Sequence, residues 1–200
     1  MKPKIIFFGT PNFAVEVLKE IYNGEIEIQA VVTSPDKKSG RGRKVNSSPV
    51  KKFCLEKKIK FYQPSNLKEK SFISTIKSYK SDIYVVVAFR MIPEVVWSIP
   101  KIGTFNLHAS LLPEYRGAAP INWVLINQES ITGLTTFIID NKIDTGKILL
   151  QSKYKIKDGE TYDTLHDNLL KIGKKLVLNT IQILFQKKYK SKEQVNNPKN

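Results

Sequence analysis

Short apolar runs alternate along this chain with segments in which apolar residues recur every three or four positions. The runs with the length of buried strands are residues 4–8, 27–33, 60–62, 82–89, 104–109, 134–139 and 148–156. The segments with helical spacing are residues 13–22, 67–80, 117–126 and 162–185. Ser48 followed by Pro49 predicts one more helix start. This alternation predicts an α/β fold with a doubly wound, mostly parallel, Rossmann-like sheet.

Position within the predicted sheet follows from the same pattern. Residues 82–89 are apolar on both faces, which is typical of a central parallel strand, whereas residues 148–156 suit an edge strand. Residues 34–48 form a polar, glycine-containing loop that is long for a compact α/β unit, and we expect it to be functional or mobile. Residues 1–188 are predicted to be one domain, and residues 189–200 a frayed polar tail.

The composition excludes several classes of protein. With 41% hydrophobic and 26% charged residues, the chain of 200 residues is a globular protein rather than a disordered or fibrous one. A single cysteine, Cys54, excludes a disulfide framework, fits a reducing cytosol and is interpreted as a core residue. The apolar runs are too short for a signal peptide or a membrane span, so we expect a cytoplasmic protein with no membrane partner. We also expect a monomer.

Positive charge is concentrated in particular segments. The net charge is +15, and residues 37–60 carry ten positive charges against one negative. Residues 61–140 are almost balanced, whereas residues 171–200 carry eight positive charges against one negative. Lys, Ile and Asn are frequent, as A/T-rich codons would produce, but a uniform bias does not explain the balanced middle. The distribution therefore favours a polyanionic partner.

Polar residues with possible chemistry cluster around one predicted strand. Asn106 and His108 are two positions apart, so they project from the same face of that strand. The alternative is a structural, hydrogen-bonded Asn–His pair. Asp144, beyond the next strand, is a candidate to orient His108 through a charge-assisted hydrogen bond. His166 is expected on a helix surface, and Gly9-Thr10-Pro11 is a tight turn rather than a dinucleotide site.

Two classes of catalytic centre have no sequence support. His and Cys show no metal-ligand spacing, so no metal is expected. No serine lies in a nucleophile elbow and the one cysteine is remote, which argues against a covalent intermediate.

Several motifs in fixed order resemble one known family. They are Phe8-Gly9-Thr10-Pro11-Asn12-Phe13-Ala14, Gly40-Arg41-Gly42, Ser48-Pro49-Val50-Lys51, Asn106-x-His108-x-Ser110-Leu111-Leu112-Pro113, Arg116-Gly117-Ala118-Ala119-Pro120 and Asp144-Thr145-Gly146. Together, over residues 4–188, they resemble the N-terminal domain of the methionyl-tRNA formyltransferases. The Asn-x-His motif with a distant Asp is common to folate-dependent formyltransferases. The other motifs resemble those of the tRNA enzymes.

The resemblance implies a role for each set of residues. Asn106, His108 and Asp144 would be catalytic, and no metal would be needed. The folate of the formyl donor, 10-formyltetrahydrofolate, would contact a second set: Ser110, Leu111, Leu112, Pro113, Phe89 and Arg90. Initiator methionyl-tRNA would contact the basic loop through Lys37, Lys38, Arg41, Arg43 and Lys44. The last assignment agrees with the charge distribution.

Two departures from the family pattern leave an alternative open. Members usually continue into a C-terminal β-barrel domain that helps to hold tRNA, and that domain is absent from the given sequence, which ends at Asn200. Either the given sequence is truncated or tRNA binding depends on the formyltransferase domain alone. Arg90 occupies a position where the family pattern predicts a glycine, and an arginine at this position resembles the amino-sugar formyltransferases. The alternative is therefore an amino-sugar or glycinamide-ribonucleotide formyltransferase with the same trio, and a third hypothesis is an inactive nucleic-acid-binding module. The basic loop argues against a small acceptor, and the intact trio argues against an inactive module.

Overall fold

The computed structural model describes residues 2–39 and 44–195, and the chain forms two compact units, Met1–Thr104 and Phe105–Asn200. Seven strands form a mostly parallel sheet with helices, which confirms the predicted α/β class. No helix in the described ranges is long and apolar enough to cross a membrane.

The first unit is built on parallel strands in the order β5-β2-β1-β6. This unit contributes to the sheet the strands β1 (Lys4–Gly9), β2 (Glu27–Val32), β5 (Phe61–Tyr62) and β6 (Ile83–Val87). Its helices are α1 (Asn12–Asn23), α2 (Pro49–Glu56), α3 (Lys70–Ser78) and α4 (Glu94–Trp97). Every residue of β6 is buried, as predicted for a central strand.

The turn between β1 and α1 is as tight as the sequence suggested. A Cβ at Gly9 would lie 2.6 Å from the Cβ of Ala14, so the close approach of α1 to the end of β1 requires glycine here. At the start of α2 the Ser48 hydroxyl accepts a hydrogen bond from the Lys51 amide, which confirms the predicted N-cap.

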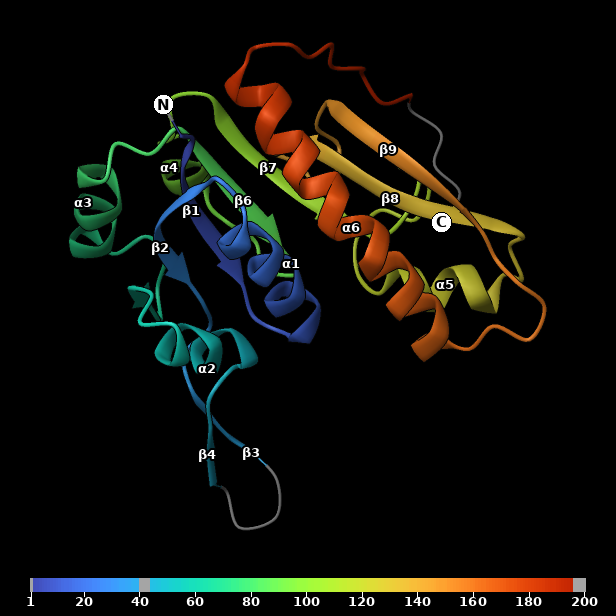
Figure 1. Cartoon of the computed structure of the whole chain (residues 1–200), viewed down its shortest axis with the longest axis horizontal. Helices are drawn as coiled ribbons and strands as arrows, with labels where there is room; N and C mark the ends of the chain where they lie inside the picture. Colours follow the sequence, from blue (N-terminus) through green and yellow to red (C-terminus); the bar gives the residue numbers. More distant parts are fainter. Residues whose placement is uncertain (1, 40–43, 196–200) are drawn as a thin grey trace. The chain divides into compact units, whose positions relative to one another are not determined.

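The segment expected to be a loop contains a hairpin. Strand β3 (Lys37–Ser39) pairs antiparallel with β4 (Lys44–Asn46), and this hairpin projects away from the rest of its unit in Figure 1. Its charged composition gave no apolar alternation from which strands could be predicted. Lys37 is exposed, whereas Arg41 and Arg43 lie outside the described residues.

Polar contacts hold the base of the hairpin. Asp36 forms an ion pair with Lys51 over 2.5 Å and accepts a hydrogen bond from Gln63 Nε2 over 2.9 Å. Gln63 also donates to the Ser34 carbonyl over 2.8 Å. The hydrogen bonds from Lys51 and Gln63 lower the pKa of the Asp36 carboxyl group.

The second unit contains the antiparallel part of the sheet. Strand β8 (Ile131–Ile138) pairs antiparallel with β7 (Gly103–His108) on one side and with β9 (Ile148–Lys155) on the other. Helix α6 (Tyr162–Phe185) packs along β8 and β9 and also contacts α5 (Pro120–Ile126), as Figure 1 shows. The bounds of α6 are those predicted, and β9 ends the strand order as an edge strand.

The lone cysteine lies in the core of the first unit. Cys54 is a free thiol with no exposed surface, which confirms its interpretation as a core residue. Burial raises the pKa of the thiol to about 12, because the surroundings disfavour the charged thiolate.

Candidate functional site

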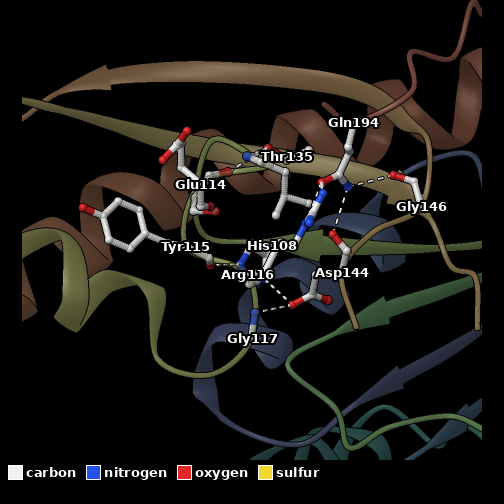
Figure 2. A network of polar contacts seen from close by, with 11 residues as sticks. His108, Glu114, Tyr115, Arg116, Gly117, Thr135, Asp144, Gly146 and Gln194 are labelled. Carbon is white, nitrogen blue, oxygen red and sulfur yellow. Dashed lines mark hydrogen bonds and ion pairs between the residues drawn. The ribbon is translucent and has the colours of Figure 1, made fainter. Parts of the chain in front are cut away.

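The predicted catalytic histidine lies at the end of β7 and is almost fully buried. Its Nε2 is 2.8 Å from the carbonyl oxygen of Tyr115 (Figure 2). Since a carbonyl oxygen only accepts hydrogen bonds, Nε2 carries a proton and donates it. The other ring nitrogen, Nδ1, is 3.6 Å from Oδ2 of Asp144. The two predicted partners are therefore neighbours, but the hydrogen bond that fixes the ring and its tautomer comes from Tyr115 rather than from Asp144.

Tyr115 presents its carbonyl to His108 because its backbone and ring are both constrained. Its φ of 56° lies in the left-handed region, which is uncommon for a residue other than glycine. The phenol donates to Glu129 Oε1 over 2.6 Å and accepts from Asn127 Nδ2 over 3.1 Å. Burial and the hydrogen bond to Glu129 raise the pKa of the phenol, so it stays a neutral donor.

Asp144 is held by the turn that follows β8. Its φ is 52°, a conformation that Asp tolerates better than most residues, and its Oδ2 accepts a hydrogen bond from the Gly117 amide over 2.8 Å. The Thr145 hydroxyl donates to Asp140 Oδ1 over 2.8 Å. A Cβ at residue 146 would lie 1.6 Å from the Ile138 carbonyl oxygen, so only glycine fits. The Asp-Thr-Gly triplet therefore shapes the turn as well as supplying the carboxylate.

Asn106 lies two positions before His108 on β7 and is partly buried. The two side chains share one face of the strand, as predicted. Within the described ranges the Asn106 amide has no recorded hydrogen-bond partner, and His108 bonds to Tyr115 instead. The alternative of a hydrogen-bonded Asn106–His108 pair is therefore not found.

The loop after β7, predicted to contact folate, is tied down through both side chains and backbone. Ser110 is fully buried and its hydroxyl donates to the Glu114 carbonyl over 2.6 Å, so this side chain shapes the loop. Leu112 is buried and its amide donates to Thr135 Oγ1 over 3.0 Å, while its carbonyl accepts from Gln151 Nε2 over 2.9 Å. Leu111 and Pro113 are partly buried.

Thr135 on β8 is a hydrogen-bonding centre that the sequence did not reveal. Its buried hydroxyl donates to the Ser110 carbonyl over 2.7 Å and accepts from the Leu112 amide and from Gln151 Nε2. All three capacities of a hydroxyl are therefore used. The only sequence indication was a pair of threonines inside an apolar strand.

A residue of the C-terminal segment joins the same network. The Gln194 amide group contacts Arg116 with its oxygen and the carbonyls of Asp144 and Gly146 with its nitrogen (Figure 2). Just before it, Lys192 exchanges two backbone hydrogen bonds with Ile148, at 2.8 and 2.9 Å. Lys192 and Gln194 are thus hydrogen-bonded to other segments of the second unit, where a frayed end was expected. Contacts across 48 to 78 sequence positions left no local pattern to detect.

The two remaining residues predicted to contact folate lie in the first unit. The ring of Phe89 meets that of Phe8 edge-on, with centroids 5.7 Å apart. The Arg90 guanidinium donates to the carbonyls of Pro64 and Ser65, the latter over 3.0 Å. Arg90 is therefore engaged by its own unit. His166 lies on α6, and its Nδ1 is 3.1 Å from Oδ1 of the neighbouring Asp167.

Comparison with known proteins identifies the family. The sequence pattern of the family described as formyl transferase matches residues 3–181. The chain is 49% identical over 181 residues to a methionyl-tRNA formyltransferase of Bacteroides thetaiotaomicron, covering 90% of this chain and 56% of the relative. A methionyl-tRNA formyltransferase of Clostridioides difficile is 46% identical over 182 residues, covering 90% and 59%. The chain thus spans less than two thirds of the length of these relatives.

Solved structures share the fold. A phosphoribosylglycinamide formyltransferase from Bacillus halodurans superposes with a TM-score of 0.77 at 18% identity, covering 92% of this chain and 96% of that one. An N-formyltransferase from Helicobacter canadensis, in complex with folinic acid and dTDP-3-aminofucose, gives 0.71 at 25% identity, covering 98% and 70%. These likenesses confirm the predicted formyltransferase type of α/β fold.

Proposed function

The chain belongs to the formyl transferase family, and from this premise we propose that it transfers the formyl group of 10-formyltetrahydrofolate to the α-amine of methionine on initiator tRNA, for translation initiation in the cytoplasm. The observation that carries the proposal is His108 held by a backbone carbonyl with its free nitrogen toward Asp144. The high identity to methionyl-tRNA formyltransferases supports the choice of acceptor.

The bonded state of His108 defines what the ring can do. Nε2–H is occupied by the Tyr115 carbonyl, so only Nδ1 is available to a substrate. When Nδ1 also carries a proton the ring is a cation, and the Asp144 carboxylate at 3.6 Å is its counter-charge. We propose that this Nδ1–H and the Asn106 amide donate to the formyl oxygen. Both groups come from one strand face, which supports a shared target.

The reaction then proceeds by addition and elimination. The amine nitrogen attacks the formyl carbon and forms the new C–N bond, while the carbonyl electrons move to the oxygen that faces Asn106 and His108. Collapse of this tetrahedral species breaks the bond to the folate nitrogen. That nitrogen takes up the proton released by the amine, and Asp144 with a water molecule would relay it.

The substrate contacts remain those implied by the resemblance. We propose that the backbone and apolar side chains of residues 110–113 hold the folate, aided by Phe89 and Arg90. The basic segment would contact the phosphates of tRNA through Lys37, Lys38, Arg41, Arg43 and Lys44. The protein would act as a monomer. Charge supports this role, since residues 37–60 carry the densest positive block of the sequence.

The test is single-turnover formyl transfer from 10-formyltetrahydrofolate to methionine-charged initiator tRNA, at low and at moderate salt. Folate-dependent transfer that falls steeply with salt would support the proposal. Parallel reactions offer a dTDP-linked amino sugar and glycinamide ribonucleotide to the same enzyme. Transfer to either small amine, with none to tRNA, would refute the proposed acceptor and retain the reaction type.

A further inference from the structure

We propose that Gln194, in the segment after α6, is a positioning residue that fixes the Asp144 carboxylate beside His108. The proposal rests on the proposed function for its consequence in turnover. Its structural basis is independent of the acceptor, because every contact involved lies within the second unit.

The Gln194 side chain uses its full hydrogen-bonding capacity. Oε1 accepts from Arg116 Nε over 3.0 Å and from Arg116 Nη2 over 2.7 Å. Nε2 donates to the carbonyl of Asp144 over 2.9 Å and to that of Gly146 over 2.8 Å. A primary amide offers two donor hydrogens and two acceptor lone pairs, and all four are engaged. The side chain of an ordinary solvated tail would form its hydrogen bonds with water, so these four protein contacts indicate a fixed position for Gln194.

These contacts cross-link two segments that both reach the Asp144 carboxylate. One segment is Arg116-Gly117, whose Gly117 amide donates to Asp144 Oδ2 over 2.8 Å. The other is the turn of residues 144–146, in which Asp144 itself has φ of 52°. Gln194 joins the side chain of the first segment to the backbone of the second. Without it, the Gly117 hydrogen bond alone would hold the carboxylate, and the 3.6 Å approach to His108 Nδ1 would loosen.

Only an amide satisfies this arrangement. Arg116 can only donate, and the two carbonyls can only accept, so residue 194 must present an acceptor to one side and a donor to the other. Glutamate would still accept from Arg116 but would place a carboxylate against two carbonyl oxygens. Alanine would remove both halves of the contact. The two substitutions therefore test the same role in different ways.

The experiment compares Gln194→Ala and Gln194→Glu with Glu193→Gln in the full chain. Glu193 is the matched control, because it is the neighbouring residue and pairs only with the exposed Lys147 over 2.8 Å among the described residues. Displacing a group that acts on the reacting atoms lowers turnover by on the order of 10- to 100-fold. We expect this loss in kcat for both Gln194 variants, with both KM values within about twofold of wild type. Glu193→Gln should match the wild type.

A second readout needs no substrate. The chain has two histidines, so the ring ¹⁵N resonances of His108 can be followed with His166 as an internal reference. Both Gln194 variants should move the His108 Nδ1 resonance and leave His166 unchanged. A fall in kcat with unchanged His108 resonances, or no change in either, would overturn the proposal. A moved His108 resonance in a protein whose wild type formylates no tRNA would support the positioning role and refute the proposed function.

Discussion

The basic hairpin and the loops around His108 both follow strands of the sheet, and the described residues of the two regions make different contacts. The hairpin is tied at its base by Asp36, Lys51 and Gln63. The loops of residues 110–117 and 140–146 are tied at many points along their length. Chemistry on a formyl carbon needs atoms fixed to fractions of an ångström, whereas attraction to phosphate needs charge on a surface. The hydrogen bonding of the described residues agrees with the two tasks proposed for these regions.

The largest effect is expected when the proposed catalytic side chains are removed from the site around His108. Asn106→Ala should lower single-turnover formyl transfer by about 10²–10³-fold, because one donor to the oxyanion is lost. Asp144→Ala should lower it by about 10²–10⁴-fold, because the counter-charge of His108 and the proton relay are lost. Near-full turnover in both variants would contradict the proposed mechanism.

The rigidity of the loops is tested by removing the hydroxyl at their centre. Thr135→Val leaves the Leu112 amide without its acceptor and the Ser110 carbonyl without its donor, and should reduce the free energy of unfolding by about 1–3 kcal/mol. Urea denaturation measures the loss.

Thr132→Val on the same strand is the control. Its hydroxyl is buried and has no partner among the described residues, so its removal should be neutral or stabilising. Equal losses in the two variants would show that the Thr135 hydrogen bonds do not stabilise the loops.

The hairpin should respond through charge rather than geometry. Lys37→Gln and Lys44→Gln should each weaken tRNA binding and reduce the slope of log K against log salt by roughly 0.7–0.9. The rate at saturating tRNA should stay near that of wild type. A fall in that rate with an unchanged salt slope would assign these lysines to catalysis instead.

The smallest expected effect is the loss of stability at low pH through Asp36. Since Lys51 and Gln63 lower the pKa of Asp36 in the folded state, this ion pair stabilises the protein above the ordinary Asp pKa of about 3.9. That contribution disappears as pH falls through the lowered pKa. An NMR titration of the Asp36 carboxyl should give a midpoint below the ordinary value in wild type, and a higher one in Lys51→Met. Identical midpoints would exclude the ion pair as the cause.

The sequence predicted those parts of the molecule whose causes are local. The apolar period of residues 162–185 is confirmed to the residue in α6, and the Ser48 cap is confirmed. Helix α3 begins at Lys70, three positions later than predicted, and β8 begins at Ile131 rather than at residue 134. Strands β3 and β4 and the one-turn helix α4 were not predicted, because charged or very short elements carry little periodicity.

The residues of the site also differ in whether a local sequence pattern predicted them. The motif identified Asn106, His108 and Asp144, and the structure brings His108 and Asp144 together. The motif could not identify Tyr115 as the residue that fixes the His108 ring, because every residue has a backbone carbonyl. Gln194 and Thr135 were missed because their roles depend on contacts distant in sequence.

The burial of Cys54 has a practical consequence for experiments on the hairpin. A maleimide reagent reacts with thiolate, and the one native thiol is covered and protonated at neutral pH. A cysteine introduced at the exposed Lys37 would therefore be the reactive one. The natural sequence already serves as a background for attaching a single fluorophore, whose response to added tRNA would report directly on the hairpin.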